Sequence, residues 1–285
     1  MPPPLYPPAG PQTIGQVLDT GFRIFQISLV RCLLYSALGM IAGQLPNIYV
    51  VLARKATTGA SFRDPAWVSL YVVGVLVSLT LYAMLLLRQH RIVTGQRTSL
   101  RTELAAAVRR LPAILGATLL ALFVVGLWVG LVMLLAAFGK FGGAPRWLAL
   151  GSVTLVMLPV LYASIPFSLV TPALMIDGRK VLDAIRYAFS LVRGNWWRTV
   201  VIYSVVGVVI IAFYVVATIV AGVLAFSVAG ADVVALTASA AVIYVALGAL
   251  GLPFSVGALL SIFGELKVRR EAVDLEMRIG EVART

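Results

Sequence analysis

Long apolar segments alternate with short, mostly basic segments along the whole chain. An apolar helix of about 20 residues is long enough to cross the hydrocarbon core of a bilayer. Six segments reach that length: 32–53, 66–87, 113–138, 147–176, 199–226 and 233–263. The pattern therefore predicts an all-α, polytopic integral membrane protein with six transmembrane helices.

Three of the polar segments have the period of an amphipathic helix. They are residues 13–30, 100–110 and 179–193. In the third, basic side chains such as Arg179 fall on one side at 100° per residue, and bulky apolar ones such as Ile185 fall on the other. Thr13 and Gln16 have the spacing of a capping box, which predicts a helix start. We expect about three amphipathic interfacial helices on the cytoplasmic side. The alternative is that they pack on their own bundle.

A short pattern recurs in these helices. Val17–Asp19 with Phe25 is repeated as Val181–Asp183 with Phe189 at the same spacing, and Glu103 stands at the equivalent place between them. Each copy is followed by two apolar segments. This arrangement favours a threefold internal repeat, and chance similarity between amphipathic helices is the alternative.

Composition supports a membrane protein and predicts its orientation. The chain is 61% hydrophobic and 12% charged, whereas soluble proteins carry about 25% charged residues. In the six-span arrangement, eighteen of the 23 Lys and Arg residues fall on the side that holds both termini. The positive-inside rule makes that side cytoplasmic. The expected domains are a disordered Pro-rich tail at 1–12, a membrane domain at 13–263 and a charged cytoplasmic tail at 264–285.

Candidate chemistry is sparse. The single Cys32 excludes an internal disulfide, and the single His90 argues against a histidine metal site. No ionisable residue lies at the centre of an apolar segment, which argues against a proton-coupled pump. No catalytic or nucleotide-binding motif is present. We therefore expect no enzyme activity, no cofactor and no metal.

The fourth apolar segment contains three prolines, Pro159, Pro166 and Pro172. A proline removes one backbone hydrogen bond and frees a carbonyl one turn earlier. Freed carbonyls and hydroxyls could line a polar cavity. The candidates for this cavity are Ser164, Ser168, Thr171 and Tyr162. The alternative is a bent helix whose hydroxyls bond to its own backbone.

The segment between the fourth and fifth apolar runs is the best candidate for contact with lipid headgroups. Basic side chains near a bilayer attract anionic lipid, and tryptophans anchor helices at the interface. The candidates are Arg179, Lys180, Arg186, Arg193, Arg198, Trp196 and Trp197. The alternative is that these residues only set orientation during insertion.

Three passages together resemble a known family. They are Thr13–Asp19 (TIGQVLD), Leu191–Arg198 (LVRGNWWR) and Glu265–Glu276 (ELKVRREAVDLE). They are similar to uncharacterised bacterial six-span proteins, some of which are described as the membrane domain of glycerophosphoryl diester phosphodiesterase. The resemblance implies a bacterial inner-membrane location. Ala272 stands where such proteins would have glycine. The chain ends where a phosphodiesterase barrel would begin, so we expect no phosphodiesterase activity.

The sequence favours a non-enzymatic membrane module that faces lipid or binds a partner through a basic cytoplasmic collar. The alternative is a transporter or channel whose path is lined by the Pro-rich fourth span. Expected partners are membrane lipids, anionic ones among them, or else a membrane protein or a second copy of the chain. Nucleic acid is not expected, because the basic residues are spread over separate loops.

Overall fold

In a computed structural model of the chain, the described residues form helices and contain no strand. They are 6–8, 10–52, 63–97, 99–141, 159–229 and 233–282. The chain divides into two compact units. Unit 1 comprises Met1–Arg109 and Val201–Thr285, and unit 2 comprises Arg110–Val200. Helices α4 and α8 each begin in one unit and end in the other.

Five helices in the described part of the chain are long and apolar enough to cross a membrane. They are α1 (Ile14–Gly43), α3 (Pro65–Val93), α4 (Leu100–Phe141), α8 (Trp196–Ala229) and α9 (Val233–Val282). The predicted class of all-α, multi-pass membrane protein is therefore confirmed. The fourth predicted span is described only from residue 159 on, as the shorter apolar helix Pro159–Met175. The number six stays a prediction.

The local sequence explains where two of these helices begin. At α1, the Thr13 hydroxyl accepts from the Gln16 amide at 3.4 Å, and the Gln16 side chain accepts from the Thr13 amide at 2.8 Å. This is the capping box that the sequence predicts. At α3, Asp64 accepts a bond from the amide of Ala66 at 3.0 Å, and Pro65 occupies the first helical position.

Two of the predicted amphipathic helices are not separate elements. Helix α1 runs through Arg31 without interruption to Gly43, because no glycine or proline stands between Phe22 and Arg31 to end it. The segment 100–110 likewise continues into α4, in spite of Pro112. The third, α7 (Val181–Val192), is a separate helix.

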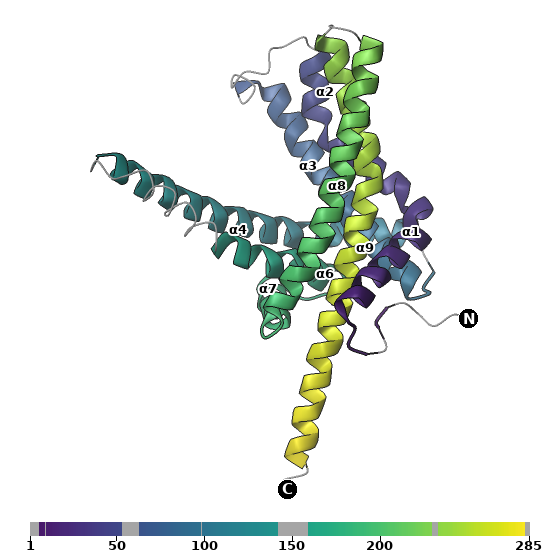
Figure 1. Ribbon diagram of the computed structural model, residues 1–285, viewed down its shortest axis with the longest axis vertical. Coiled ribbons are helices and arrows are strands. Elements are labelled where there is room, and N and C mark those ends of the chain that lie inside the picture. Colours follow the sequence, from purple (N-terminus) through teal and green to yellow (C-terminus); the bar gives the residue numbers. More distant parts are fainter. Residues whose placement is uncertain are drawn as a thin grey trace. The chain divides into compact units, whose positions relative to one another are not determined.

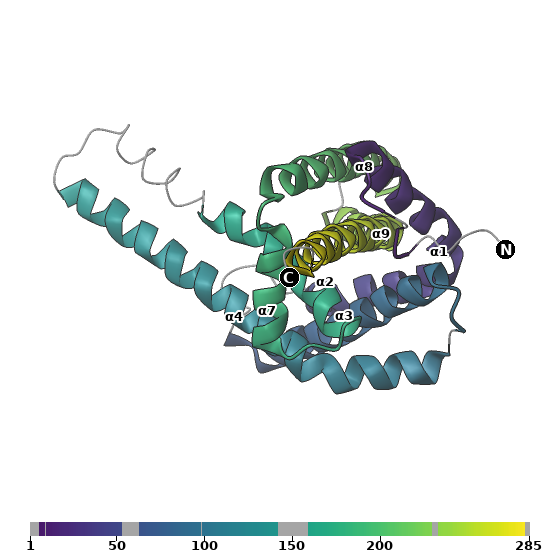
Figure 2. The ribbon, with the colours of Figure 1, turned by 90° about the horizontal axis from the view of Figure 1, so that it is seen from below.

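Unit 1 is built around α1, which packs closely against both α9 and α3 (Figures 1 and 2). Short α2 (Leu45–Leu52) packs on α3. The backbones approach closely at glycines. A Cβ atom at Gly74 would lie 2.4 Å from the carbonyl oxygen of Ala42, and one at Gly21 would lie 3.1 Å from the Cα atom of Ala258. Small residues at such contacts are typical of membrane helices.

Side chains also bond to backbone carbonyls across these helices. Pro253 cannot donate to the carbonyl of Ala249 one turn earlier. Ser36 on α1 donates to that oxygen at 2.7 Å, and Gln89 on α3 donates to the carbonyl of Pro253 at 2.8 Å. The interior of the bundle thus supplies a partner for a backbone group that a proline leaves free.

Tyr6 and helix α9 do not follow the predicted domain boundaries near the two ends of the chain. Tyr6 lies edge-on to His90 at 5.0 Å and is 6% exposed, because its ring is buried beside Gly264 of α9. Helix α9 continues past residue 264 without a break. Residues 1–5 and 9 lie outside the described residues, so the disordered tail stays a prediction.

Unit 2 contains α6 (Val170–Met175) packed against α7. The rings of Phe167 and Phe189 meet edge to face at 5.7 Å. Gly178 (φ 67°) and Gly194 (φ 87°) flank α7 and adopt the left-handed conformation that favours glycine. They allow the chain to enter and leave this helix by sharp turns.

Candidate functional site

The basic segment, Asp177–Arg198, lies entirely in unit 2 and is organised by α7. Lys180 precedes α7 at its N-cap, Arg186 lies within it, and Arg193 follows at its C-cap. All three side chains are exposed. Lysine is not a capping residue, and Lys180 makes no side-chain capping bond. Its side chain is therefore exposed and does not cap the helix.

Arg179 packs against neighbouring side chains. Its guanidinium lies over the ring of Tyr187 at 3.6 Å, and its Nε atom is 3.8 Å from a carboxylate oxygen of Asp177. Its carbonyl accepts a bond from Arg110 at 3.3 Å. Arg179 therefore stabilises the turn before α7. Arg198 is half-buried.

The two predicted tryptophan anchors divide into a packed ring and an exposed one. Trp196 stacks on Tyr162 at 5.1 Å with 28° between the rings, and it meets Trp197 edge to face at 4.6 Å. Trp197 is 76% exposed. Trp196 thus joins α8 to the preceding apolar helix, and Trp197 is the ring that is free to enter an interface.

The predicted apolar face of α7 coincides only in part with its buried face, because Val192 of that face is buried. The buried side chains include Ala184, Ala188 and Leu191, whereas Leu182 is 61% exposed and Phe189 is half-buried. Alanines let α7 approach α6 closely. The helix therefore has a buried face and an exposed face that carries Leu182, Asp183 and Arg186.

The polar-cavity candidates make local contacts. Ser164 donates to the carbonyl of Leu161 at 2.8 Å, and Ser168 donates to that of Ile165 at 2.6 Å. Thr171 is half-buried, and Tyr162 is 52% exposed and stacked on Trp196. The two serines thus follow the alternative in which hydroxyls bond to their own helix.

The sequence did not predict a buried ionic cluster in unit 1. The carboxylate of Glu103, which is fully buried, accepts bonds from Arg88 Nη1 at 3.1 Å and Tyr35 Oη at 3.3 Å. Arg88 also donates to Tyr35, and Arg91 lies 3.9 Å from the other carboxylate oxygen. The cluster ties the start of α4 to α1 and α3. The signal that could have found it is a lone acid in a basic segment, with a tyrosine inside an apolar run.

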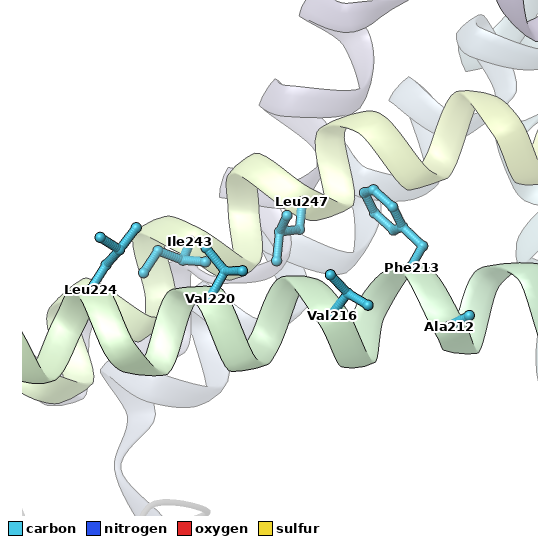
Figure 3. Close-up of a pocket in the computed structure, with 7 residues that line it drawn as sticks. All are labelled: Ala212, Phe213, Val216, Val220, Leu224, Ile243 and Leu247. Atoms are coloured by element: carbon cyan, nitrogen blue, oxygen red, sulfur yellow. The ribbon is translucent and has the colours of Figure 1, made fainter.

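The seam between α8 and α9 contains an apolar pocket of about 530 Å³. Figure 3 shows its lining side chains pointing from the two helices toward one another. They are Ala212, Phe213, Val216, Val220, Leu224, Ile243 and Leu247. This lining offers no group for acid–base or nucleophilic chemistry, and it suits a hydrocarbon chain.

Within the described residues, no group of three or more His, Cys, Asp and Glu could hold a metal ion. No family model matches the chain, and no curated protein or solved structure matches it either. The class defined by the fold is an all-α, multi-pass membrane protein.

Proposed function

We propose that this chain is a non-enzymatic membrane protein whose basic segment binds anionic lipid headgroups. The observation that carries the proposal is the placing of three exposed cations, Lys180, Arg186 and Arg193, in the same segment as exposed Leu182 and Trp197. Cations and apolar side chains exposed together are typical of a membrane-surface helix.

The energetics favour this combination. A basic residue near an anionic surface contributes about 1 kcal/mol, and stable attachment to a membrane surface needs a second, apolar contribution. Leu182 and Trp197 supply it. Asp183 is the exposed acid of α7, so the segment keeps an excess of positive charge.

The proposal includes six spans in a bacterial inner membrane, with both termini in the cytoplasm and a threefold repeat of one amphipathic segment and two spans. The five apolar helices and the uneven distribution of Lys and Arg support it. So does the resemblance to the six-span proteins described as membrane domains of glycerophosphoryl diester phosphodiesterase. A membrane-protein partner or a second copy of the chain stays the alternative ligand for the same surface.

A transporter or channel with a path along the Pro-rich helix is less well supported. Its hydroxyls would have to face a path, and those of Ser164 and Ser168 donate to carbonyls of their own helix. These contacts favour the lipid-binding proposal.

The test is to replace Lys180, Arg186 and Arg193 together with glutamine and to measure lipid bound to the purified protein by native mass spectrometry. Arg179 is kept, because it packs on Tyr187. With about 1 kcal/mol per cation, bound phosphatidylglycerol and cardiolipin should fall by about tenfold or more at low salt. The difference should shrink at high salt, where the attraction is screened.

The matched control removes the same charge from unit 1 by replacing Arg97, Arg101 and Arg109, which are also exposed. It should retain most of the anionic lipid. An unchanged lipid profile in the first variant would refute the proposal. An equal loss in both variants would show that net charge matters and the basic segment does not.

A further inference from the structure

A second apolar pocket follows the one in Figure 3 along the same two helices. Both pockets lie inside unit 1. The second pocket has a volume of about 300 Å³ and is lined by three of the membrane-length helices, α1, α8 and α9. Its lining residues are Val17, Leu18, Asp19, Phe22, Ile202, Val205, Val206, Val209, Phe254, Ala258 and Ile262. Both pockets therefore lie between α8 and α9.

The two pockets follow one another along both helices. On α8 the lining residues run from Ile202 to Leu224 and recur every three or four residues, with adjacent pairs at 205–206 and 212–213, which places them on one face. On antiparallel α9 they run in the opposite order, from Ile262 to Ile243. At 1.5 Å per residue the α8 face is about 33 Å long. A bilayer core is about 30 Å thick, so the seam is long enough for an extended hydrocarbon chain.

The seam has one charged end. Asp19 is the ionisable residue among those that line the two pockets. Its carboxylate lies 3.7 Å from Arg23, one turn further along α1, and the two side chains are 71% and 64% exposed. A carboxylate and a guanidinium thus stand together where the apolar lining begins.

We propose that this seam binds a phospholipid with a primary ammonium headgroup, such as phosphatidylethanolamine. Its acyl chain lies between α8 and α9, its ammonium group pairs with Asp19, and its phosphate pairs with Arg23. The charges of the protein pair and of the headgroup are complementary. A lipid with only a negative headgroup offers no cation to Asp19 and is disfavoured, which sets this site apart from the basic segment.

A phospholipid fits both the apolar seam and the charged pair at its end. The three helices are of membrane length, and α8 side chains along the seam such as Val209 and Val216 are 46% and 62% exposed. A bilayer presents acyl chains to such a surface. A partner helix would satisfy the apolar face, but it gives no role to the charged pair at one end. The proposal uses unit 1 alone, so it does not depend on the lipid binding proposed for unit 2.

The headgroup is tested with Asp19→Asn, which keeps the size of the side chain and removes its charge. The full-length protein is equilibrated with vesicles of phosphatidylethanolamine and phosphatidylglycerol, and its bound lipid is measured by native mass spectrometry. Bound phosphatidylethanolamine should fall by about two- to fivefold, the range for an exposed ion pair. Asp183→Asn is the matched control, because it stands in the same Val-Leu-Asp motif on α7 and should keep its bound phosphatidylethanolamine. If the Asp19 variant binds it as the wild type does, the headgroup assignment is wrong.

The seam is tested with Val205→Trp, which fills the second pocket, against Val208→Trp, which adds the same ring to an exposed position of α8 outside the pockets. Only the first should displace bound phosphatidylethanolamine. Glycerophosphoethanolamine, which has the headgroup and no chains, should not compete. Equal lipid binding by the two tryptophan variants, or competition by the chain-free headgroup, overturns the seam as the site. So does a second copy or another protein that replaces the lipid in the wild-type mass spectrum.

Circular dichroism and thermal unfolding show whether the Val205→Trp variant has folded. If it has not folded, the near-isosteric Asp19→Asn variant decides the proposal. The outcomes for the two lipid sites remain separate. Loss of phosphatidylethanolamine reports on Asp19 and the seam, and loss of phosphatidylglycerol or cardiolipin reports on Lys180, Arg186 and Arg193.

Discussion

Glu103 is a fully buried carboxylate in a protein of net charge +12. Burial of a charge costs several kcal/mol unless partners compensate for the lost water. Here Arg88 and Tyr35 donate to one carboxylate oxygen, and Arg91 lies near the other. The arginines keep a path to solvent through side chains that are 19% and 22% exposed. This cluster therefore stabilises the packing of α1, α3 and the start of α4 in unit 1.

Glu103→Gln should lower the free energy of unfolding by about 3 kcal/mol, because it leaves Arg88 without the charge that compensates its partial burial. Thermal unfolding in detergent, followed by tryptophan fluorescence, measures the effect. Asp19→Asn is the comparison. It breaks an exposed ion pair, so it should cost less than about 1 kcal/mol. Equal costs for the two variants would show that Glu103 does not stabilise the bundle.

The pairing of Arg88 with Glu103 could not be predicted from their spacing in the sequence. Arg88 and Glu103 fall in a basic connection between two predicted spans, where each reads as a solvated charge. They meet because α3 continues to Val93 and α4 starts at Leu100. Tyr35 comes from the middle of α1 and completes the cluster. The pairing depends on which helices become neighbours.

Helix α7 combines a buried face with an exposed face that is both apolar and charged. Ala184 and Ala188 are buried, Leu182 is exposed and apolar, and Arg186 is exposed and charged. Leu182 and Arg186 stand one turn apart on the exposed face. A helix at a bilayer surface exposes apolar and basic side chains together.

Spin labels attached at single cysteines in α7 should report these faces if the helix lies at the membrane surface. A label at Asp183 should be accessible to an aqueous quencher, and one at Leu182, 100° away around the helix, should be accessible to oxygen dissolved in the bilayer. A label at Ala184 should be shielded from both, or should disturb the packing on α6. Equal aqueous accessibility at Asp183 and Leu182 would rule out placement at the membrane surface. Each variant also replaces native Cys32 with serine, so that one label is attached.

Some helix boundaries follow from the local sequence, and others do not. The start of α1 and the bounds of α7 follow from a capping box and two flanking glycines, which act within a few residues. The predicted break near Arg31 does not occur. A change from amphipathic to fully apolar pattern shows a change of surroundings, and a helix can cross that change without ending.

At the scale of the whole molecule, the distribution of charge predicts orientation. In the six-span arrangement, eighteen of the 23 Lys and Arg residues lie on one side, and that excess should retain both termini in the cytoplasm. A reporter fused after Thr285 should be cytoplasmic, and one inserted beside Lys140 should be on the opposite side. Alkaline phosphatase and green fluorescent protein fusions measure this, because each is active on one side of the inner membrane. The same side for both reporters would refute the six-span topology.

The seam between α8 and α9 is a property of the whole of unit 1. Its lining comes from α8 and α9, which follow one another in the chain, and from α1, which is distant in sequence and supplies the charged end. The apolar pattern of α8 alone is nearly uniform around the helix, as expected for a membrane span. It therefore gives no hint of which face meets α9.

The sequence by itself determined the class of the protein, because the length and composition of an apolar run fix whether a helix can cross a bilayer. It also determined the cap at Thr13 and located the candidate basic segment, since these depend on near neighbours. The tertiary structure decided which of those cations are exposed, where Arg179 pairs, and how Glu103 and the α8–α9 seam are assembled. The Glu103 cluster and the seam depend on helices that meet across many residues, and the contacts of Arg179 depend on the turn that brings it onto α7. In an all-apolar helix every face satisfies the membrane equally well, so only packing against its neighbours selects one.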